Sequence, residues 1–516
     1  MNTLNHILLS EVEGFRAIGH KFLSGEISKM EFKGISGGMG VYAQGSGKEF
    51  VIRFRIPSGI ASIKDLKLVY NFAQRYKLET VHLTTRQAIQ LHGISIDEAC
   101  DAMEEGIKKG LYSRGAGGNF PRNVALSPLS GVDKKEAFDA SPYAKEVVQY
   151  ILNKVYTYKL PRKLKVAFSS SEEDDSHVTA VDLGFLAVNE NSKQYFKVYL
   201  GGGMGRNSKL SANTEQLIKP EDILYHVQAM TELFINEGDY VNKGRARIRY
   251  IMERMGQEKF EKCYKNYLEK VKKTENLMIS VESKVYDKQG IETFTKNTRL
   301  FSQKQNGLYS VYVHPIGGIL KIQHLKLIMN KIEAMADVEI RLAMTEGFYI
   351  RNLNGNEAEI IIKLTESMGG NTALESSICC IGVPTCQMGI LESQRTLRNI
   401  LSYFKDNNLT EDILPQLHIS GCPNSCSVHE IGIIGFCGKK KKVQDKIINV
   451  FELHFDGVLG IGKTKLAKNY GDIKEEEVPR FLFELASAVH NSNKEFNSWK
   501  DENEEELNKI INTYLV

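Results

Sequence analysis

The stretch FRIPSGIASIKDLKLV, residues 54–69, has a second copy in the same chain, VHPIGGILKIQHLKLI, at residues 313–328. Each copy begins as a short apolar strand, passes through a turn with proline and glycine, and ends in a segment with apolar residues at helical spacing. The helical positions of the first copy are Ile63, Leu66, Val69 and Phe72. A second short strand follows each copy. The pattern predicts two compact α+β units separated by roughly 250 residues, much longer than the period of a solenoid.

A second kind of segment recurs at nearly the same offset. Its copies pair LPRKLKVAFSSS (160–171) with LPQLHISGC (414–422), VDLGF (181–185) with GIIGF (432–436), and VYLGGGMG (198–205) with LHFDGVLG (453–460). Three pairs with matching spacing are hard to explain by chance. The chain is therefore predicted to be a duplicated protein. Each half would hold a small and a larger α+β domain, and the halves would be related by a pseudo-twofold axis.

The two copies differ most in their charged residues. In the first copy one strand reads Arg53-Phe54-Arg55, and the alternation of a β-strand places both guanidinium groups on one face. The corresponding strand of the second copy carries Val311 and Val313 instead. Arg86 also has no basic counterpart in the second copy. A pseudo-twofold axis would bring the cationic strands of the first half to a central cleft that faces the cysteines of the second half.

The composition is that of an ordinary globular protein. Hydrophobic residues make up 42% and charged residues 25% of the 516 residues, unlike a disordered or membrane chain. A net charge of +4 is too small to indicate a general nucleic-acid or membrane-surface binder. The N-terminus has no basic segment ahead of its short apolar run, and no run of about 18 apolar residues occurs. These features predict a cytoplasmic enzyme that makes no contact with nucleic acid or membrane.

Five of the eight cysteines crowd between residues 379 and 426. In a reducing compartment such clusters indicate metal binding or catalysis rather than disulfides. The loops CIGVPTC (380–386) and GCPNSC (421–426) would supply four thiolates to a structural zinc ion or an iron–sulfur cluster. Zinc loops have shorter gaps than the five residues of the first loop, so the spacing favours the cluster. Cys379, next to Cys380, leaves the ligand at that position open, and burial as small apolar residues is the alternative interpretation.

Basic residues form a second candidate group. They lie on strand-like segments or beside glycine turns, flanked by residues that should be core. Lys and Arg are rarely buried without a partner, so a bound polyanion would satisfy them. Surface arginines on edge strands are the alternative, and the GGGMG turn (201–205) alone is not a nucleotide-binding signature. The group comprises Arg53, Arg55, Arg86, Arg122, Lys163, Lys165, Arg206, Arg245 and Arg247.

Six motifs carry a resemblance to a known family: TTRQAIQLHGI, PRNV, LPRKLK, LGGGMG, NKGRARIRYIMERMG and GCPNSC, in this order. With the cysteine spacing, they resemble the sirohaem-containing sulfite and nitrite reductases from about residue 35 to about residue 465. The resemblance implies an α+β, duplicated pseudo-twofold fold with sirohaem and a 4Fe–4S cluster at its centre. We expect four units: residues 1–100 with the first ferredoxin-like half-domain, 101–290 with the first sirohaem-binding domain, 291–365 with the second half-domain, and 366–516 with the cluster-binding domain and C-terminal helices.

The resemblance also implies residue roles. It makes Cys380, Cys386, Cys422 and Cys426 the cluster ligands, with Cys426 bridging to the sirohaem iron. The residues that it places on the substrate side, to bind an oxyanion and donate protons, are Arg53, Arg122, Lys163 and Lys165. The carboxylates of sirohaem would explain the other cations. The residues implied to hold the macrocycle are Arg55, Arg86, Gln90, His92, Arg206, Arg245, Arg247, Asn424 and Cys426.

The implied reaction is the reduction of sulfite to sulfide in six one-electron steps, with nitrite to ammonia as the close alternative. His92 and Lys165 favour sulfite, because nitrite-specific plant-type members tend to carry Arg and Asn there. However, GCPNSC and PRNVALSPLSG also resemble nitrite-type sequences. An alternative from another class is a zinc-stabilised RNA-binding protein, although the interleaved aromatic residues of such binders are missing.

The electrons are expected to come from a partner protein. The repeats and cluster loops leave about 35 residues before them and about 50 after, too few for a flavin or nicotinamide domain. By resemblance the donor is a ferredoxin, with a separate flavoprotein subunit as the alternative. Lysines 439–442 follow the cysteine loop closely. They would either steer an acidic donor or form a solvated loop.

Overall fold

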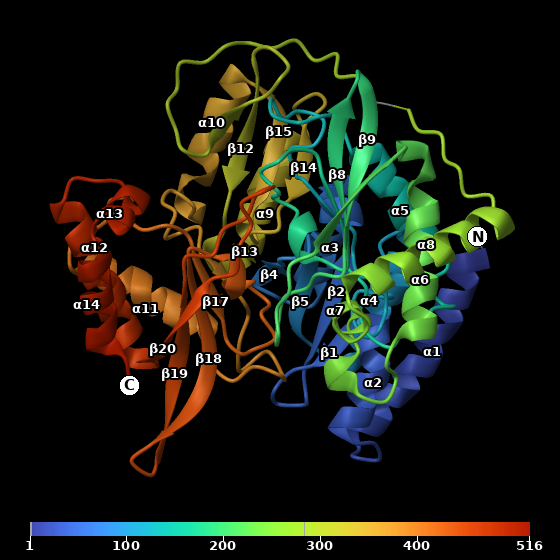
Figure 1. Ribbon diagram of the computed structural model, residues 1–516, viewed down its shortest axis with the longest axis horizontal. Helices are drawn as coiled ribbons and strands as arrows, with labels where there is room; N and C mark the ends of the chain where they lie inside the picture. Colours follow the sequence, from blue (N-terminus) through green and yellow to red (C-terminus); the bar gives the residue numbers. More distant parts are fainter. Residues whose placement is uncertain (1–2, 283) are drawn as a thin grey trace.

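The computed structural model describes residues 3–282 and 284–516. Its strands form four five-stranded sheets, numbered I to IV (Figure 1). Sheet I has the order β1 (Val41–Ala43), β2 (Phe50–Arg55), β5 (Ala88–Ile94), β4 (Thr80–Leu83) and β13 (Ile319–Lys321). Sheet III has the order β11 (Leu300–Ser302), β12 (Leu308–Val313), β15 (Phe348–Asn354), β14 (Glu339–Leu342) and β3 (Ile60–Ala61). Each of these sheets thus takes its last strand from the other half of the chain.

The exchange of β3 and β13 is symmetric. Ile319 of β13 lies opposite His82 of β4, and Ala61 of β3 lies opposite Ile340 of β14. The turn before each exchanged strand ends in a glycine with positive φ, +72° at both Gly59 and Gly318. A Cβ at Gly59 would lie 2.7 Å from the carbonyl oxygen of Leu342, and one at Gly318 would lie 2.7 Å from that of Leu83. Only glycine lets the two turns approach this closely, and one continuous core underlies both sheets.

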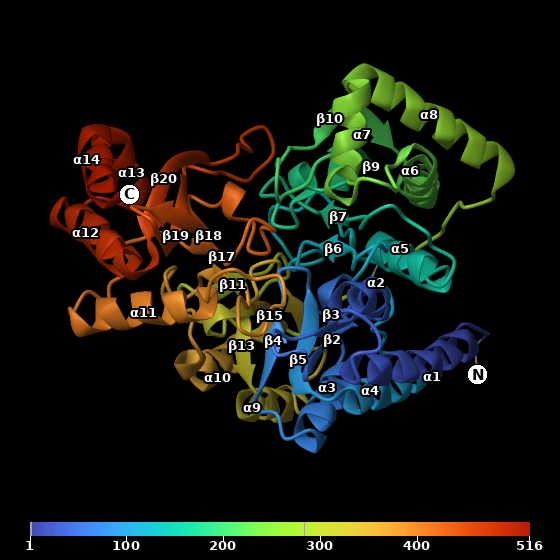
Figure 2. The same ribbon diagram turned by 90° about the horizontal axis from the view of Figure 1, so that it is seen from below.

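Helices pack beside sheets I and III (Figure 2). The helices beside sheet I are α1 (Thr3–Leu23), α2 (Lys29–Met39), α3 (Ile63–Arg75) and α4 (Ile96–Lys109), and those beside sheet III are α9 (Ile322–Ile332) and α10 (Gly355–Thr365). The equivalent helices α4 and α10 each begin with a capping box, in which Ser95 pairs with Glu98 and Asn354 with Glu357. The duplication thus extends to the helix starts, and α3 confirms the predicted helix after residue 62.

Sheets II and IV repeat a second topology, two parallel pairings followed by two antiparallel ones. Sheet II has the order β10 (Ala212–Ile218), β9 (Lys193–Leu200), β8 (Leu183–Glu190), β7 (Val166–Ser169) and β6 (Ala125–Leu126). Sheet IV has the order β16 (Ile378–Cys379), β17 (Leu417–Ser420), β18 (Ile434–Val443), β19 (Lys446–Phe455) and β20 (Lys468–Lys474). Each sheet has its own apolar core. The division of the chain into four units remains a prediction.

Sheets II and IV lie on either side of sheets I and III, each with its own helices (Figure 2). Beside sheet II lie α5 (Ser141–Asn153), α6 (Ile223–Glu237), α7 (Ile248–Met255) and α8 (Gln257–Thr274). Beside sheet IV lie α11 (Ser393–Asp406), α12 (Val478–Asn491), α13 (Phe496–Glu502) and α14 (Glu504–Tyr514). The arrangement leaves sheet I between the loops of sheet II and those of sheet IV.

Lysines 439–442 lie in strand β18 and not in a loop, contrary to the simplest sequence interpretation. Lys439 contacts Glu452 at 2.6 Å and Asp472 at 2.7 Å, and Lys441 contacts Asp472 at 2.9 Å. Side chains that alternate along β18 therefore meet acids on β19 and β20. Much of the positive charge of this run is neutralised within the sheet.

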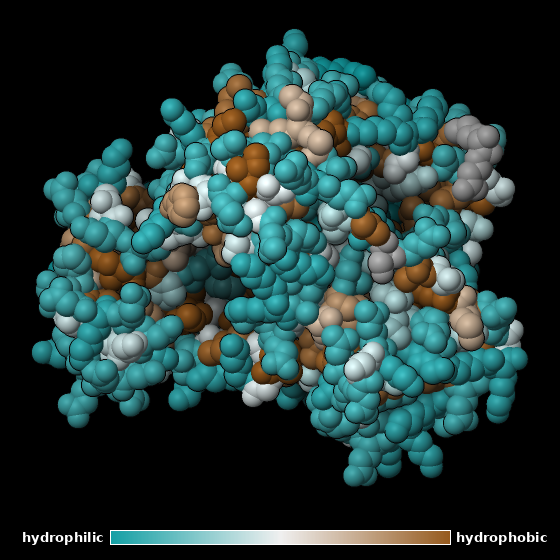
Figure 3. Space-filling view, turned by 90° about the horizontal axis from the view of Figure 1, so that it is seen from above, coloured by the Kyte–Doolittle hydropathy of each residue, from teal (hydrophilic) through white to brown (hydrophobic). Residues whose placement is uncertain are grey.

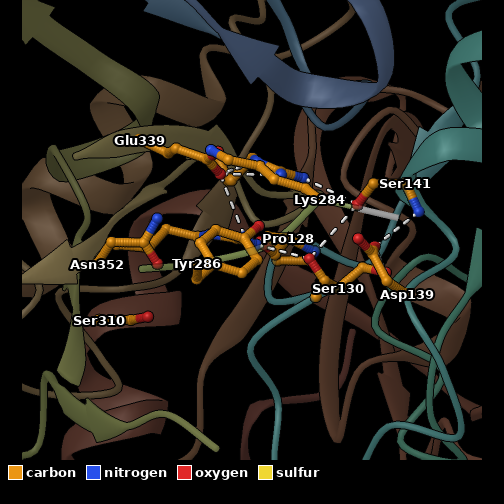
Figure 4. A network of polar contacts seen from close by, with 12 residues as sticks. Pro128, Ser130, Asp139, Ser141, Lys284, Tyr286, Ser310, Glu339 and Asn352 are labelled. Carbon is orange, nitrogen blue, oxygen red and sulfur yellow. Dashed lines mark hydrogen bonds and ion pairs between the residues drawn. The ribbon is translucent and has the colours of Figure 1, made fainter. Parts of the chain in front are cut away.

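A buried polar network joins sheet III to the loop that leads into α5 (Figure 4). Arg351 of β15 is fully buried and donates to the carbonyl oxygens of Pro128 and Ser130, each at 2.8 Å. It also donates to the Tyr286 hydroxyl at 2.9 Å and contacts Glu339 at 3.2 Å. Because Tyr286 belongs to the irregular segment between the two halves, this arginine fastens that segment across the molecule.

The face seen from above is largely hydrophilic, with apolar side chains in small groups (Figure 3). Within residues 3–282 and 284–516, no helix has the length and apolar character required to cross a membrane.

Candidate active site

The basic residues of the first half converge from three elements. Arg53 lies on β2 directly opposite Gln90 of β5, and His92 is two residues farther along the same strand. Arg86 occupies the turn after β4. Arg122 precedes β6, and its backbone N–H donates to the carbonyl oxygen of Leu164 at 2.8 Å. Strand β2, the turn after β4 and the segment before β6 thus bring these cations together.

Two of these guanidinium groups have nitrogen atoms without hydrogen-bond partners. Arg86 donates to the carbonyl oxygens of Asn123 at 2.9 Å and Val166 at 2.6 Å, but its Nη1 is buried and pairs with no atom of the described residues. Nη1 of Arg122 is in the same situation. Burial lowers the pKa of Arg86 to about 9 and that of Arg122 to about 10. Buried cationic donors of this kind are what a polyanionic ligand would satisfy.

Lys163 and Lys165 lie on either side of Leu164, whose backbone pairs with Pro121 in an isolated parallel bridge. Strand β7 begins only at Val166, so the two lysines lie in an extended segment just before it and not in the strand itself, contrary to the prediction. Alternation about Leu164 still places both on one side of the chain.

The two lysines are held in a positive environment. Burial, the neighbouring Lys165 and Arg247 keep the pKa of Lys163 well below its ordinary range. Burial, Arg86 and Arg247 lower the pKa of Lys165 to about 7. The thiol of Cys426 is close enough to act on both lysines in the opposite direction. Lys165 can therefore exchange a proton near neutral pH, and the pKa of Lys163 is lowered in the same direction, at a position that faces the cysteine loops.

Arg247 and Arg55 are fixed by the protein itself. Arg247 makes a two-pronged contact with the buried Asp182, its Nη2 lying 2.9 Å and 2.8 Å from the two carboxylate oxygens. Asp182 also accepts from the backbone N–H of Lys165 at 2.8 Å. Arg55 donates to the carbonyl oxygens of Pro121 at 3.0 Å and Arg122 at 3.2 Å. These two arginines hold in place the segments that carry the lysines and Arg122.

The four cysteines come from two loops at the edge of sheet IV. Cys380 Sγ accepts from the backbone N–H of Gly421 at 3.1 Å and contacts the Ser393 hydroxyl at 3.2 Å. The Asn424 side chain donates to Cys422 Sγ at 3.4 Å. Burial raises the pKa of Cys380, Cys386 and Cys422, and each of these thiols is near enough to Cys426 for its charge to contribute. Backbone donors aimed at sulfur suit thiolate ligands.

No group of three or more His, Cys, Asp or Glu side chains in the described part of the chain is arranged around one metal ion. In a 4Fe–4S cluster each thiolate binds a different iron, so four ligands do not need to converge on one point. The donor set and the two loops fit a cluster of that kind.

The two halves meet directly at the cysteine loop. The Thr85 hydroxyl, beside Arg86, donates to the carbonyl oxygen of Cys426 at 2.7 Å. On the other side, Glu430 accepts from Gly205 N at 3.0 Å and from the Ser208 hydroxyl at 2.7 Å, and also from the Ser425 hydroxyl. The GGGMG turn of the first half is thereby held against the loop that carries Cys426.

Comparison with known proteins identifies a family with a site of this kind. A family model described as the nitrite and sulphite reductase 4Fe-4S domain matches residues 117–272, and one described as the nitrite/sulfite reductase ferredoxin-like half domain matches residues 42–108. The chain belongs to the sulfite and nitrite reductase family. It is an oxidoreductase, and the cofactors of this family are sirohaem and a 4Fe–4S cluster. The matched residues lie in the first half, whereas the cysteines lie in the second.

Curated reductases align over most of the chain. A ferredoxin–nitrite reductase of Synechococcus elongatus is 24% identical, covering 84% of this chain and 85% of that protein. A ferredoxin sulfite reductase of Mycolicibacterium paratuberculosis is 23% identical over 80% of this chain and 74% of its own length. The haemoprotein beta-component of an NADPH sulfite reductase of Bacillus licheniformis is 27% identical over 84% and 80%. The solved structure of Mycobacterium tuberculosis NirA protein has the same fold, with TM-score 0.78, 21% identity and coverage of 93% and 92%.

Several of the predicted site residues are exposed. Arg245 is exposed on a short turn, with its guanidinium 5.9 Å from the Tyr250 ring. Arg206 and Asn424 are exposed near Cys422. The roles of these residues, and of the rest of the predicted site, remain predictions.

Three residues of the site were missed by the sequence analysis. Asp182 lies in the repeated VDLGF segment. An acidic residue close to a predicted cationic strand could have been identified from the sequence as a partner for these cations. Tyr42 was not singled out. Burial alone would raise its pKa, but Arg122 and Arg53 lower it below the ordinary value. Glu430 gave no signal, because the contact that it makes joins distant parts of the chain.

Proposed function

We propose that this enzyme reduces sulfite to sulfide, taking up six electrons and six protons and releasing three waters. The observation that carries the proposal is the convergence of Arg53, Arg122, Lys163 and Lys165 at a place that faces Cys426. An oxyanion bound there would meet two guanidinium cations and would have two lysines beside it as proton donors.

The cofactors fit the residues present. Cys380, Cys386, Cys422 and Cys426 would hold the cluster, with Cys426 shared with the sirohaem iron. The unpartnered nitrogen atoms of Arg86 and Arg122 fit a macrocycle that bears carboxylates. The remaining residues that we assign to the macrocycle are Arg55, Gln90, His92, Arg206, Arg245, Arg247 and Asn424. When bound, the two cofactors supply the electrons and the iron atom that binds the substrate.

The protein's own residues do the rest. Arg53 and Arg122 would bind substrate oxygen atoms through charge-assisted hydrogen bonds. Lys163 and Lys165 would release protons to these oxygens as the S–O bonds break, because their environment lowers both pKa values, that of Lys165 to about 7. Asp182 and Arg55 keep these groups in position.

We choose sulfite over nitrite as the substrate because of two residues, His92 and Lys165, which favour sulfite by family resemblance. The relatives include both kinds of reductase. Reduction of nitrite to ammonia is therefore the second candidate. The alternative of a zinc-stabilised RNA-binding protein has no support among these relatives.

The test is a comparison of kcat/KM for sulfite and nitrite, measured on the holoenzyme with a chemically reduced viologen dye as donor. We expect the value for sulfite to exceed that for nitrite by at least about tenfold. A larger value for nitrite would overturn the assignment of substrate and leave the reductase family intact.

We further propose that an electron-donor protein, a ferredoxin or a separate flavoprotein subunit, supplies the enzyme. The relatives include ferredoxin and NADPH types, which supports a partner without choosing between them. A cytoplasmic location remains a prediction from the sequence.

A further inference from the structure

A row of three polar residues crosses sheet I behind the proposed substrate site. Arg53 on β2 lies opposite Gln90 on β5, and Gln90 lies opposite His82 on β4. His92 follows on the same face of β5, and its ring centroid is 5.3 Å from that of His82. His82 was not among the residues that the sequence indicated.

The amide of Gln90 has one orientation that satisfies all its neighbours. Its oxygen then accepts from Arg53 Nε at 2.9 Å and Nη2 at 2.7 Å, while its nitrogen donates to His82 Nδ1 at 3.0 Å and to His92 Nε2 at 3.2 Å. The reverse orientation would turn the amide N–H groups toward the guanidinium, where no acceptor exists. The two imidazoles must therefore be neutral and must accept from Gln90 on the nitrogens named.

This arrangement leaves part of Arg53 free for a ligand. A third N–H of the group, on Nη1, donates to the carbonyl oxygen of Ala116 at 3.3 Å. Of the five N–H donors of a guanidinium, one on Nη1 and one on Nη2 remain. Because the Gln90 oxygen accepts from Nε and Nη2 of Arg53 at once, the plane of the guanidinium group is fixed. The direction of the two remaining N–H groups is fixed with it.

The second half has different side chains at this register. With the turn glycines Gly59 and Gly318 taken as equivalent, the corresponding row of sheet III is Tyr312 on β12, Tyr349 on β15 and Arg341 on β14. The two tyrosine rings lie 4.8 Å apart. The arginine–glutamine–histidine row therefore occurs only in sheet I, in the half that holds the substrate cations.

We propose that His82 is a positioning residue, which acts through Gln90 to hold Arg53 in the orientation that binds the substrate oxyanion. The inference rests on the proposed role of Arg53 in the reductase. His82 is 5% exposed, and burial lowers its pKa to about 4. It therefore stays a neutral acceptor at working pH.

The test uses holoenzyme variants and the dissociation constant of sulfite, measured by optical titration of the oxidised enzyme, together with KM and kcat. His82→Leu removes the acceptor, so the Gln90 amide can turn and the fork to Arg53 is lost for part of the time. We expect sulfite binding and KM to weaken about tenfold, with a smaller effect on kcat. His82→Asn keeps an acceptor at the position of Nδ1 and should stay within about threefold of the parent.

Two control variants distinguish the positioning role of His82 from a general effect of removing a buried histidine and from a failure of the role proposed for Arg53. His226→Leu removes another buried histidine, which is bonded to Tyr264 at 2.7 Å between helices α6 and α8, and should leave sulfite binding unchanged. Arg53→Gln should weaken sulfite binding at least as much as His82→Leu. If Arg53→Gln has no effect, the proposed role of Arg53 fails; if it weakens binding and His82→Leu does not, only the positioning role fails.

A measurement on the parent enzyme tests the proposal even where a variant such as His82→Leu does not fold. Histidine ¹⁵N spectra should show His82 with a proton on Nε2 and His92 with a proton on Nδ1, assigned by comparison with the His82→Asn and His92→Asn variants. The opposite tautomer at His82, or equal losses in His82→Leu and His82→Asn, would overturn the proposal.

Discussion

Cys379 and Cys380 are adjacent in sequence but have different surroundings. Cys379 ends strand β16, is fully buried and packs into the apolar core of sheet IV. Cys380 follows it and points the other way, as the alternation of a strand requires. Its sulfur meets the backbone N–H of Gly421, next to the GCPNSC loop. The sequence left the ligand at this pair open, and the geometry supports Cys380.

We therefore predict different outcomes for the two serine variants. Cys380→Ser should lose iron and acid-labile sulfide together with most of the sirohaem absorption, because one thiolate is shared between the cofactors. Cys379→Ser should keep both cofactors, although it places a hydroxyl in the core and should lower stability by roughly 1 kcal/mol. Metal analysis and the absorption spectrum check this. A colourless Cys379→Ser protein would reassign the ligand.

A second prediction concerns substrate choice at Lys165. Lys165→Asn should raise the ratio of nitrite to sulfite activity, because Asn lacks the positive charge that favours the more highly charged sulfite. Total sulfite turnover should fall by about 100-fold, the usual effect of removing a charged donor to a developing anion. Both rates are measured with the same viologen donor on enzyme of matched sirohaem content. An unchanged ratio would remove Lys165 from the substrate argument.

At the scale of elements, equivalent turns in the two halves carry Gln87 and Glu346. Both have positive φ, 50° and 67°, and both anchor the first strand of the neighbouring sheet, sheet II or sheet IV. The Gln87 side chain bonds Leu126 of β6 through both its oxygen and its nitrogen. Glu346 accepts from the backbone N–H of Cys379 of β16 at 2.8 Å. A carboxyl group thus stands where the other half uses an amide.

This equivalence predicts the effect of Glu346→Gln. Burial raises the pKa of Glu346 well above its ordinary value. The folded state therefore holds a proton that the unfolded chain releases, and stability falls as pH rises above the unfolded pKa, near 4.3. Glu346→Gln removes this loss. Its unfolding free energy should exceed that of the parent by roughly 1 kcal/mol at about pH 8, with the gain shrinking toward about pH 4.

Thermal unfolding of the cofactor-free protein at both pH values checks the sign. Glu333→Gln is the matched control, since Glu333 is exposed and pairs with Lys67 at the surface. Equal destabilisation by Glu346→Gln at both pH values would contradict the assignment.

The sequence predicted some of these elements and missed others for identifiable reasons. The strand, turn and helix of residues 54–69 were predictable, because apolar spacing and the turn residues agree. The exchange of β3 and β13 was not, because strands of two and three residues have no periodicity of their own. The β18–β19 hairpin was missed because four successive lysines are unusual in a strand, and their acidic partners lie on distant strands.

At the scale of the whole molecule, duplication followed by divergence separated the chemistry. The first half supplies cations and the second supplies thiolates, and contacts such as Thr85 with Cys426 bring them together. The cysteines and most cations could be identified from the sequence because their residue types are chemically distinctive. Positioning residues such as Glu430 and His82 could not, because the role of an ordinary acid or histidine depends on the partner that folding places beside it.

The last prediction concerns the source of electrons. Lys439 and Lys441 are paired with acids inside sheet IV, so docking of an acidic donor would depend little on them. Reduced ferredoxin should support sulfite turnover by the purified holoenzyme, with a rate that falls as salt screens the association. NADPH alone should support none. Lys439→Gln should retain the parent's salt dependence. A strong loss of salt dependence in that variant would show that the lysine run contributes to the docking surface. Turnover with NADPH and no other protein would show that this chain needs no donor protein.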